Sequence, residues 1–347
     1  MKPRTIQLTW PGKESGADSR ARGLARARPR QVPARAWAAP GGSLLVQDDN
    51  LSALSTLSGT HEGEVTLAYM DPPFFTGRVH DAKIGKKDDR VRVAAFDDRW
   101  EDQASFLETL AARLEATWRL LAPHGSLVIH VDPRTSHYIK VLADEIFGPE
   151  AFASEIVWRY RRWPSKTPNF QRVHDVLLRF RKDPKVRPRW NQPYEPLAAS
   201  TLTTWGTRKQ KAVFATSGRR ARSSSTEEAT PGAPMGDVWE LGLIAPVAHE
   251  RTGYPSQKPE ALLERIILAL SDPGDWVLDP YAGSGTTLAV AARAGRRFIG
   301  IDESLVAIDT VQKRLEKAGV KLVPVTREAS SPNALPELRE VSPAGGR

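Results

Sequence analysis

The sequence of 347 residues contains no cysteine and only three methionines. The lack of cysteine excludes disulfide bridges, thiolate metal sites and cysteine nucleophiles, and with them the zinc deaminases. Long hydrophobic runs are also missing. The longest apolar segments, such as 261–270 and 286–292, fall short of the roughly 20 residues that a membrane-spanning helix needs. We therefore expect a protein without a membrane partner and predict a location in the bacterial cytoplasm.

Basic residues are in modest excess over acidic ones. The chain has 50 Lys and Arg against 41 Asp and Glu, a net charge of +9. A positive field favours a polyanionic partner but does not identify one. Residues 1–40 are rich in Arg, Pro, Gly and Ala, which predicts a basic, flexible arm able to contact phosphates. Glu14 and Asp18, and the lack of an amphipathic stripe, argue against a transit peptide.

Apolar runs and helical periodicities alternate along most of the chain. Strands are predicted at 43–47, 65–70, 126–131, 276–278 and 297–301, and helices at 51–57, 106–121, 137–147, 259–270, 286–294 and 305–317. Segments 155–161 and 173–181 predict a hairpin at the edge of the sheet. This alternation predicts an α/β fold, with a mostly parallel sheet covered by helices on both faces.

Two long segments lack such periodicity. Residues 183–245 concentrate Pro, Ser, Thr, Lys and Arg and are predicted to be an inserted region. The insertion separates two halves of one domain, residues 41–182 and 246–322, and residues 323–347 are predicted to form a flexible tail. The polar segment 75–99 is predicted to be a mobile loop. It either closes over a substrate or is a solvated surface excursion.

Acidic residues stand at the ends of four predicted strands. They are Asp49, Asp71, Asp279 and Asp302. In open α/β sheets, ligands bind beyond the carboxyl ends of the strands. We therefore expect the four carboxylates to surround one site.

The segment 278–287, LDPYAGSGTT, joins a strand to a helix through a glycine-rich turn. Gly283 and Gly285 allow the backbone to pass close to a ligand, and Asp302, about twenty residues on, can accept hydrogen bonds from ribose hydroxyls. The turn lacks the lysine of a P-loop and the full G-x-G-x-x-G spacing of a dinucleotide site. The pattern favours a nucleotide-binding unit, with phosphate binding as an open alternative, over a tight turn without a ligand.

The segment 71–74, DPPF, follows the strand 65–70, and Pro72 and Pro73 cannot continue that strand because proline has no amide donor. The exocyclic amine of a base is a poor nucleophile, since its lone pair is delocalised into the ring. If the Asp71 carboxylate and the Pro72 carbonyl accept its two hydrogens, the nitrogen becomes more tetrahedral and can attack a methyl group. Phe74 could stack on a base taken out of the duplex. Alone, such a tripeptide is more often a rigid loop entry, but its pairing with the glycine turn favours chemistry.

These motifs resemble those of DNA amino-methyltransferases of the β arrangement, in which D-P-P-[YF] precedes the target-recognition region and the cofactor motif comes last. The chain is also similar to modification subunits of restriction systems at residues 8–13 and 49–51. Segment 252–260, TGYPSQKPE, resembles the family's segment just before the glycine turn. The resemblance covers about residues 43–182 and 246–317.

The resemblance implies a circularly permuted Rossmann-like methyltransferase fold, S-adenosylmethionine as cofactor, and target recognition by the insertion. It implies a catalytic set of Asp71, Pro72, Pro73 and Phe74. It implies cofactor contacts by Asp71, Asp279, Tyr281, Ala282, Gly283, Gly285 and Thr286, by Asp302 on the ribose, by Asp49 at the adenine end, and by Ser256, Gln257 and Lys258 at the amino-acid end. Phe74 replaces a commoner tyrosine, which keeps the stacking face and loses a hydroxyl.

Basic and aromatic residues interleave at 158–172, and a second basic cluster follows at 208–222. This composition suits phosphate contacts and base stacking. For Trp158 and Tyr160, a place in the core is the alternative.

The predicted function is methylation of adenine N6 in double-stranded DNA. Cytosine N4 is the nearest alternative. In the family that the chain resembles, cytosine-N4 enzymes often have Ser in place of Asp71, so Asp71 favours adenine. A methyltransferase for RNA or a small molecule and a binding-only module are further alternatives, which the basic insertion and the intact 71–74 motif respectively disfavour. By analogy alone, a homodimer and a partner subunit of a restriction system are also expected.

Overall fold

The computed structural model describes residues 6–10, 13, 35–84, 91–166, 168–219, 221 and 223–325. The chain divides into two compact units. The larger unit comprises Met1–Trp190 and Val238–Arg347, and the smaller one comprises Asn191–Asp237.

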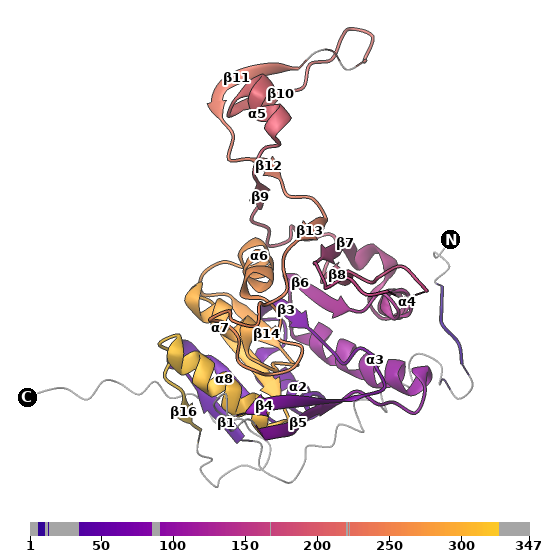
Figure 1. Cartoon of the computed structure of the whole chain (residues 1–347), viewed down its shortest axis with the longest axis vertical. Helices are drawn as coiled ribbons and strands as arrows, with labels where there is room; N and C mark the ends of the chain where they lie inside the picture. Colours follow the sequence, from indigo (N-terminus) through magenta and orange to yellow (C-terminus); the bar gives the residue numbers. More distant parts are fainter. Residues whose placement is uncertain are drawn as a thin grey trace, which may run out of the picture. The chain divides into compact units, whose positions relative to one another are not determined.

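The larger unit is built on a ten-stranded mixed sheet (Figure 1). Its strands are β1 (Arg35–Ala38), β2 (Leu44–Gln47), β3 (Val65–Met70), β6 (Leu121–Val131), β7 (Phe152–Arg159), β8 (His174–Arg181), β13 (Val238–Glu240), β14 (Trp276–Asp279), β15 (Arg297–Asp302) and β16 (Val323–Pro324). Their order is β13-β7-β8-β6-β3-β14-β15-β2-β1-β16. The five central strands, from β6 to β2, are mutually parallel. Their near-continuous apolar sequences are typical of strands that are buried on both faces.

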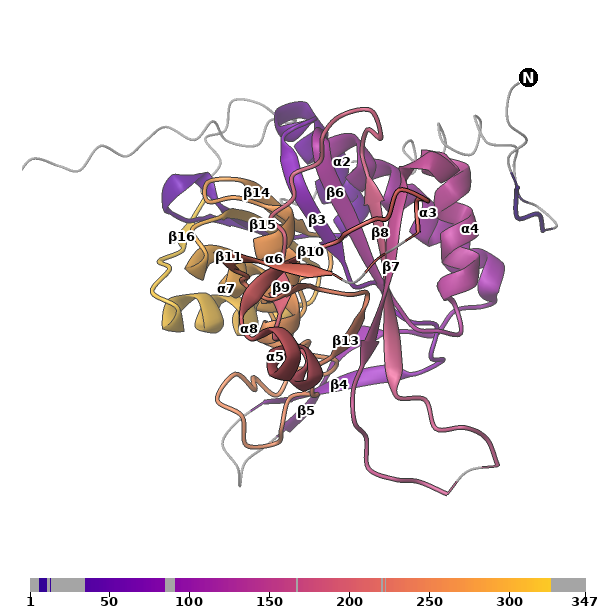
Figure 2. The same cartoon turned by 90° about the horizontal axis from the view of Figure 1, so that it is seen from above.

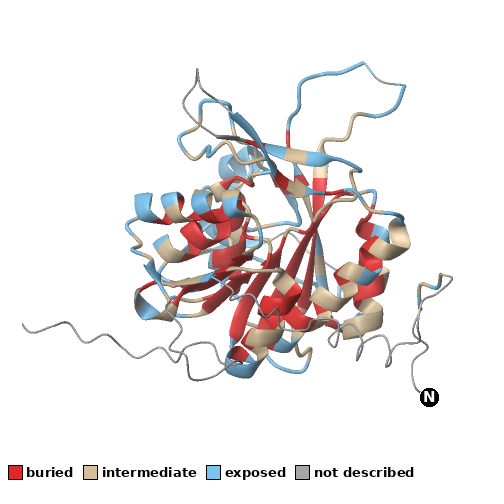
Figure 3. Ribbon diagram, turned by 90° about the horizontal axis from the view of Figure 1, so that it is seen from below, coloured by how far each residue is buried: buried red, intermediate tan, exposed pale blue. Residues whose placement is uncertain are grey.

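Helices cover both faces of this sheet, which confirms the predicted fold class. The helices are α2 (Asn50–His61), α3 (Gln103–Leu120), α4 (Ser136–Phe147), α6 (Glu260–Leu270), α7 (Thr286–Arg293) and α8 (Leu305–Lys317). Helices α2, α3 and α4 pack side by side on one face, and α6, α7 and α8 pack on the other. Figure 3 shows the buried strands between these two helical layers, whose inner faces are buried as well. Within the described ranges, no helix has the length and apolarity needed to cross a bilayer.

The segment predicted as a mobile loop, 75–99, contains a β-hairpin instead. Strands β4 (Val79–Ile84) and β5 (Val91–Asp97) pair antiparallel from Val79 opposite Asp97 to Ile84 opposite Val91. Ala82 and Ala95 are its buried residues. Because alanine is not a strand-favouring residue and the neighbouring positions are charged, the alternation was hidden in the sequence.

The ends of the larger unit also differ from the prediction of a flexible arm and tail. Strand β1 pairs with β2 and β16 pairs with β1, so residues 35–38 and 323–324 extend the sheet. Trp10 packs against the core and donates from Nε1 to Glu108 (2.9 Å). Strands this short carry no periodic signal, which is why the sequence concealed them. The rest of the predicted arm and tail lies outside the described residues.

The smaller unit consists of short elements. Helix α5 (Ala199–Trp205) is followed by β10 (Arg208–Lys211) and β11 (Ser224–Ala229), which pair antiparallel. Strands β9 (Tyr194–Glu195) and β12 (Ala233–Pro234) also pair. The unit is shorter at both ends than the predicted insertion, 183–245, because Arg189 bonds to His124 in the larger unit and β13 joins the large sheet.

Candidate functional site

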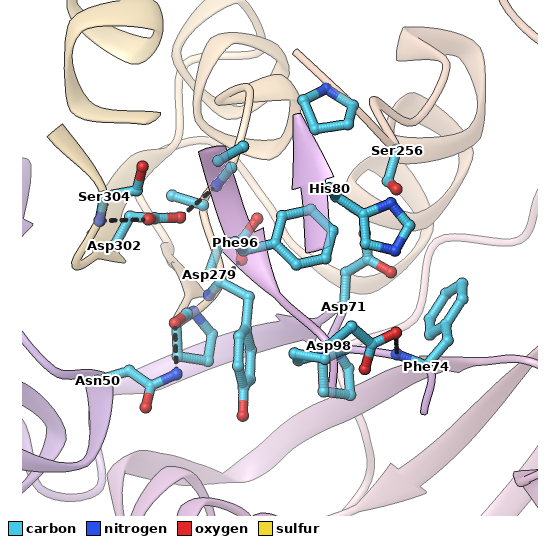
Figure 4. A pocket seen from close by; sticks show the side chains of 18 of the residues that line it. Asn50, Asp71, Phe74, His80, Phe96, Asp98, Ser256, Asp279, Asp302 and Ser304 are labelled. Atoms are coloured by element: carbon cyan, nitrogen blue, oxygen red, sulfur yellow. Dashed lines mark hydrogen bonds between the residues drawn. The ribbon is translucent and has the colours of Figure 1, made fainter. Parts of the chain in front are cut away.

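A cavity of about 290 Å³ lies beyond the carboxyl ends of β2, β3, β14 and β15 (Figure 4). Every predicted site residue except Gly285 lines it: Asp49, Asp71, Pro72, Pro73, Phe74, Ser256, Gln257, Lys258, Asp279, Tyr281, Ala282, Gly283, Thr286 and Asp302. The volume is close to the lower end of the range for small-molecule sites, about 300–1,000 Å³. The structure therefore brings the two sequence motifs together, while the individual roles stay predictions.

The glycine turn is held by the two acids that flank it. Asp302 accepts hydrogen bonds from the backbone N–H of Gly283 (2.8 Å) and of Ser304 (2.9 Å). Asp279 accepts from the backbone N–H of Tyr281 (3.0 Å). Burial raises the pKa of Asp302 to about 6 and that of Asp279 to about 7, because a charged carboxylate loses its hydration there. Both carboxylates line the cavity and fix its backbone wall.

Gly285 serves packing rather than lining. Its φ of +73° is unfavourable for other residues, and a Cβ atom there would lie 2.9 Å from Val311 Cγ2 on α8. The missing side chain thus allows the start of α7 to approach α8. The cavity lining does not include Gly285, and its predicted contact with the cofactor stays a prediction.

At the opposite end of the cavity, Asp49 caps helix α2 by accepting from the Ser52 N–H (3.1 Å). Its second oxygen pairs with Arg113 (2.8 Å), which also bonds to Asn50. Asn50 in turn donates to the carbonyl of Pro280 (3.1 Å), next to the glycine turn. Sequence reasoning missed Arg113 because it is one of several polar residues on an amphipathic helix.

The catalytic candidate Asp71 directly follows β3, and its two carboxylate oxygens have different surroundings. Lys258 Nζ bonds to Asp71 Oδ2 and to the carbonyl of Ser256 (3.2 Å). Asp71 Oδ1 is buried, and none of the described residues forms a hydrogen bond with it. The same Lys258 ammonium lies 5.1 Å from the centre of the Phe74 ring. Lys258, predicted to contact the cofactor's amino-acid end, is thus also the partner of the candidate catalytic carboxylate.

The backbone after Asp71 is organised by Asp98, which is 1% exposed. Its carboxylate accepts from three successive backbone N–H groups, those of Phe74 (3.2 Å), Phe75 (2.9 Å) and Thr76 (2.8 Å). Phe75 has a φ of +58°, a conformation that needs such support. Asp98 was missed because it falls in the segment predicted to be a mobile loop.

A buried polar chain lies behind Phe74. The ring of His130 lies 5.6 Å from that of Phe74, and His130 bonds to the Tyr69 hydroxyl (2.7 Å) and to Asp175 (3.4 Å). The Tyr160 hydroxyl donates to the other oxygen of Asp175 (2.9 Å). Burial opposes ionisation of Asp175, but the hydrogen bonds with its partners outweigh burial and lower its pKa. None of these residues carries a motif, so the chain was invisible in the sequence.

Tyr160, 3% exposed, and Trp158, 1% exposed, are both buried. For these two residues the structure supports the alternative interpretation, a place in the core. Burial also raises the pKa of Tyr160 to about 12, so that its hydroxyl remains a donor to Asp175.

The segment before α6 is clamped onto the glycine turn. The side chain of Gln257 accepts from the Thr252 N–H (2.8 Å) and donates to the Glu250 carbonyl (2.6 Å), so its amide closes its own loop. The carbonyl of Lys258 accepts from the Thr286 hydroxyl (3.1 Å). Tyr254, also missed as a site residue, lines the cavity beside Gly283.

Comparisons with known proteins agree with this geometry. A family model described as DNA methylase matches residues 65–313. The type II methyltransferase M.HpaI of Haemophilus parainfluenzae is 30% identical over 265 residues, which cover 76% of this chain and 72% of that protein. The DNA adenine methyltransferase YhdJ of Escherichia coli (strain K12) is 30% identical over 267 residues, covering 77% and 81% respectively.

The fold is also similar to a solved structure, PvuII DNA methyltransferase (cytosine-N4-specific). The TM-score is 0.52 at 16% identity, with 81% of this chain and 93% of that chain covered. At this identity the similarity concerns the fold alone.

Proposed function

The chain belongs to the DNA methylase family of adenine-N6 and cytosine-N4 enzymes, and we propose that it transfers a methyl group from S-adenosylmethionine to adenine N6 in double-stranded DNA.

The proposal depends mainly on the state of the Asp71 carboxylate. Lys258 orients it through Oδ2, whereas the buried Oδ1 accepts no hydrogen bond from the described residues, and His130 Nδ1 lies 3.9 Å from it. A buried carboxylate oxygen without a donor is costly and therefore suited to accept one from a substrate. An exocyclic amino group of a base supplies that donor. The adjacent Phe74 ring, which lines the same cavity, offers a face on which the base stacks.

The amino group donates one hydrogen to Asp71 Oδ1 and the other to the Pro72 carbonyl, which turns its lone pair out of the base plane. When bound, S-adenosylmethionine supplies a methyl group on a positively charged sulfur. The amino nitrogen held by Asp71 and Pro72 would take this methyl group, and the electron pair of the broken carbon–sulfur bond would stay with the cofactor. The nitrogen then carries a positive charge and gives one proton to Asp71, which releases it to water.

The lining of the cavity fits this cofactor in chemical terms. The glycine turn at Gly283 forms a wall without a side chain, and the Asp302 carboxylate can accept from ribose hydroxyls. Asp49 and Asn50 line the far end, where they can meet a purine amine. Ser256 and Lys258 carry the polar groups near the amino-acid end.

Adenine is favoured over cytosine because the motif begins with Asp71, where cytosine-N4 enzymes of this family often have serine. The similarity to a DNA adenine methyltransferase across 77% of the chain supports the same choice.

The proposal is tested with purified protein, radiolabelled S-adenosylmethionine and unmethylated bacterial genomic DNA, followed by digestion to nucleosides. We expect label in N6-methyladenine with the native protein and none with Asp71→Asn, which keeps the shape and removes the charge. Asp309→Asn, on the exposed face of α8, is the matched control and is expected to retain activity. Label in N4-methylcytosine, or labelling that persists in Asp71→Asn, would contradict the proposal.

A further inference from the structure

The connection between β7 and β8, residues 160–173, carries two aromatic side chains that have no place in the core. Trp163 is 92% exposed and Phe170 is 100% exposed. Figure 2 shows this connection, here named the aromatic loop, extending well beyond the ends of its strands, and Figure 3 shows it as largely exposed. Two large rings held in water on one loop indicate a surface that is completed by a partner.

The charge of the aromatic loop identifies the chemistry of that partner. Residues 160–173 contain no Asp or Glu, and Arg161, Arg162 and Lys166 are all exposed. Cations interleaved with exposed rings match a polyanion that also offers flat aromatic faces, which describes a nucleic acid.

The base of the aromatic loop is fixed to the catalytic motif. Tyr160 bonds to Asp175, which bonds to His130, whose ring packs against Phe74. The Tyr160 N–H also donates to the Val173 carbonyl (2.8 Å), which closes the base of the loop. The loop thus starts beside the position where the base would be held.

Farther out, the two arms of the loop are linked. Gln171 Nε2 donates to the Trp163 carbonyl (2.7 Å), which brings the backbone of Trp163 near that of Phe170. On the inner side, Arg172 pairs with Asp132, next to the end of β6. These contacts hold the two exposed rings on one projecting loop.

We propose that the aromatic loop enters duplex DNA next to the target base, and that Trp163 and Phe170 fill the space that the extruded base leaves in the stack. The inference rests on the proposed function, because it supplies the base extrusion that the position of Asp71 inside the cavity requires. Extrusion costs a few kcal/mol of lost stacking and pairing, and an inserted ring offsets part of that cost. Arg161, Arg162 and Lys166 contact the flanking phosphates.

The test compares a paired target with one that needs no extrusion. Duplexes carrying a methylation site mapped on genomic DNA are prepared with the target adenine either paired or opposite an abasic position. For Trp163→Ala/Phe170→Ala we expect kcat/KM on the paired target to fall by about 10- to 100-fold, corresponding to stacking of about 1–3 kcal/mol, and by less than about threefold on the unpaired one. Trp163→Phe/Phe170→Tyr keeps both rings and is expected to retain most activity on both duplexes.

Equal losses on the two duplexes, or no loss on either, would overturn the inference, and so would failure of the ring-preserving variant. Val323→Ala, which shortens an exposed apolar side chain on β16, controls for a general surface effect. Anisotropy of a labelled duplex measures binding without methylation. If the native protein binds duplex through the two rings but methylates nothing, the proposed function fails and the DNA contact of the loop stands.

Discussion

The two halves of the cavity are lined by carboxylates that are used in different ways. In the half formed by the glycine turn, both oxygens of Asp302 accept backbone N–H groups, and Asp279 also accepts one. In the half formed by the 71–74 motif, one oxygen of Asp71 accepts no hydrogen bond from the described residues, and His130 Nδ1 lies 3.9 Å from it. The backbone after Asp71 is held by another acid, Asp98, which accepts three of its N–H groups.

The carboxylates of the two halves therefore have different tasks: some hold the backbone in place, and one is available to a substrate. A carboxylate whose two oxygens both accept backbone N–H groups stabilises a turn and keeps further lone pairs for a ligand, whereas one with an oxygen that accepts no hydrogen bond can respond to the reacting group of a substrate. Asp98 and Asp302 carry out the first task in the two halves. Asp71, oriented by Lys258, is left for the second.

The largest expected effects on methyl transfer and cofactor binding come from removing the charge of Asp71 or of Asp302 in separate variants. Asp71→Asn is expected to lower methyl transfer by about 10³-fold at saturating cofactor, with cofactor affinity within about threefold of the native value. Asp302→Asn is expected to weaken cofactor binding by about 10- to 100-fold and to recover most transfer at saturating cofactor. Titration calorimetry and labelled methyl transfer measure the two quantities.

Loss of cofactor binding in Asp71→Asn, or loss of transfer at saturation in Asp302→Asn, would break the distinction between the two carboxylates. Asp309→Asn, an exposed residue of α8, is the control for both assays.

Much of this architecture could be predicted from the sequence because the central elements are strongly patterned. Strand β3 coincides with the predicted 65–70, and α8 coincides with the predicted 305–317. The carboxyl ends of parallel strands meet at one edge, so four acids at strand ends predicted one cavity. Local pattern and topology agree there, which is the condition under which sequence reasoning succeeds.

The remainder depends on contacts between distant residues that no local pattern encodes. Lys258 and Asp71 are 187 residues apart in the sequence, and the chain from Tyr160 to His130 joins the residue after β7 to strands β8 and β6. The β4–β5 hairpin was missed since its buried residues are alanines. Asp98, which directly follows this hairpin, was missed for the same reason, although it holds the backbone after Asp71 through three hydrogen bonds.

A smaller effect, on stability, is expected from Gly285→Ala. This variant tests whether the start of α7, after the glycine turn, packs tightly against α8. The new Cβ would lie 2.9 Å from Val311 Cγ2 on a backbone with φ +73°. We expect a loss of about 2–3 kcal/mol in the free energy of unfolding, measured by urea denaturation with tryptophan fluorescence. Gly319→Ala is the matched control, with φ +81° and nothing within 4 Å of its Cβ, and isolates the backbone strain at about 1 kcal/mol. Equal losses would show that the approach of α7 to α8 is not tight.

The smallest effect concerns pH and separates the two halves without changing their shape. Burial raises the pKa of Asp302 to about 6, above the value near 4 of an unfolded chain. The folded state therefore binds more protons between these values, so this residue's contribution to stability is present below about pH 4 and is lost as pH rises through about 6.

Cofactor affinity should change in the opposite direction, because only the ionised carboxylate accepts well from a ribose hydroxyl. Between pH 7 and pH 5 the ionised fraction falls about tenfold, so we expect affinity to fall by up to about the same factor. Calorimetric titrations across this range should lose the step near pH 6 in Asp302→Asn and keep it in Asp71→Asn. A step that persists without Asp302 would assign it to another group, with Asp279, whose pKa is raised to about 7, as the next residue to replace.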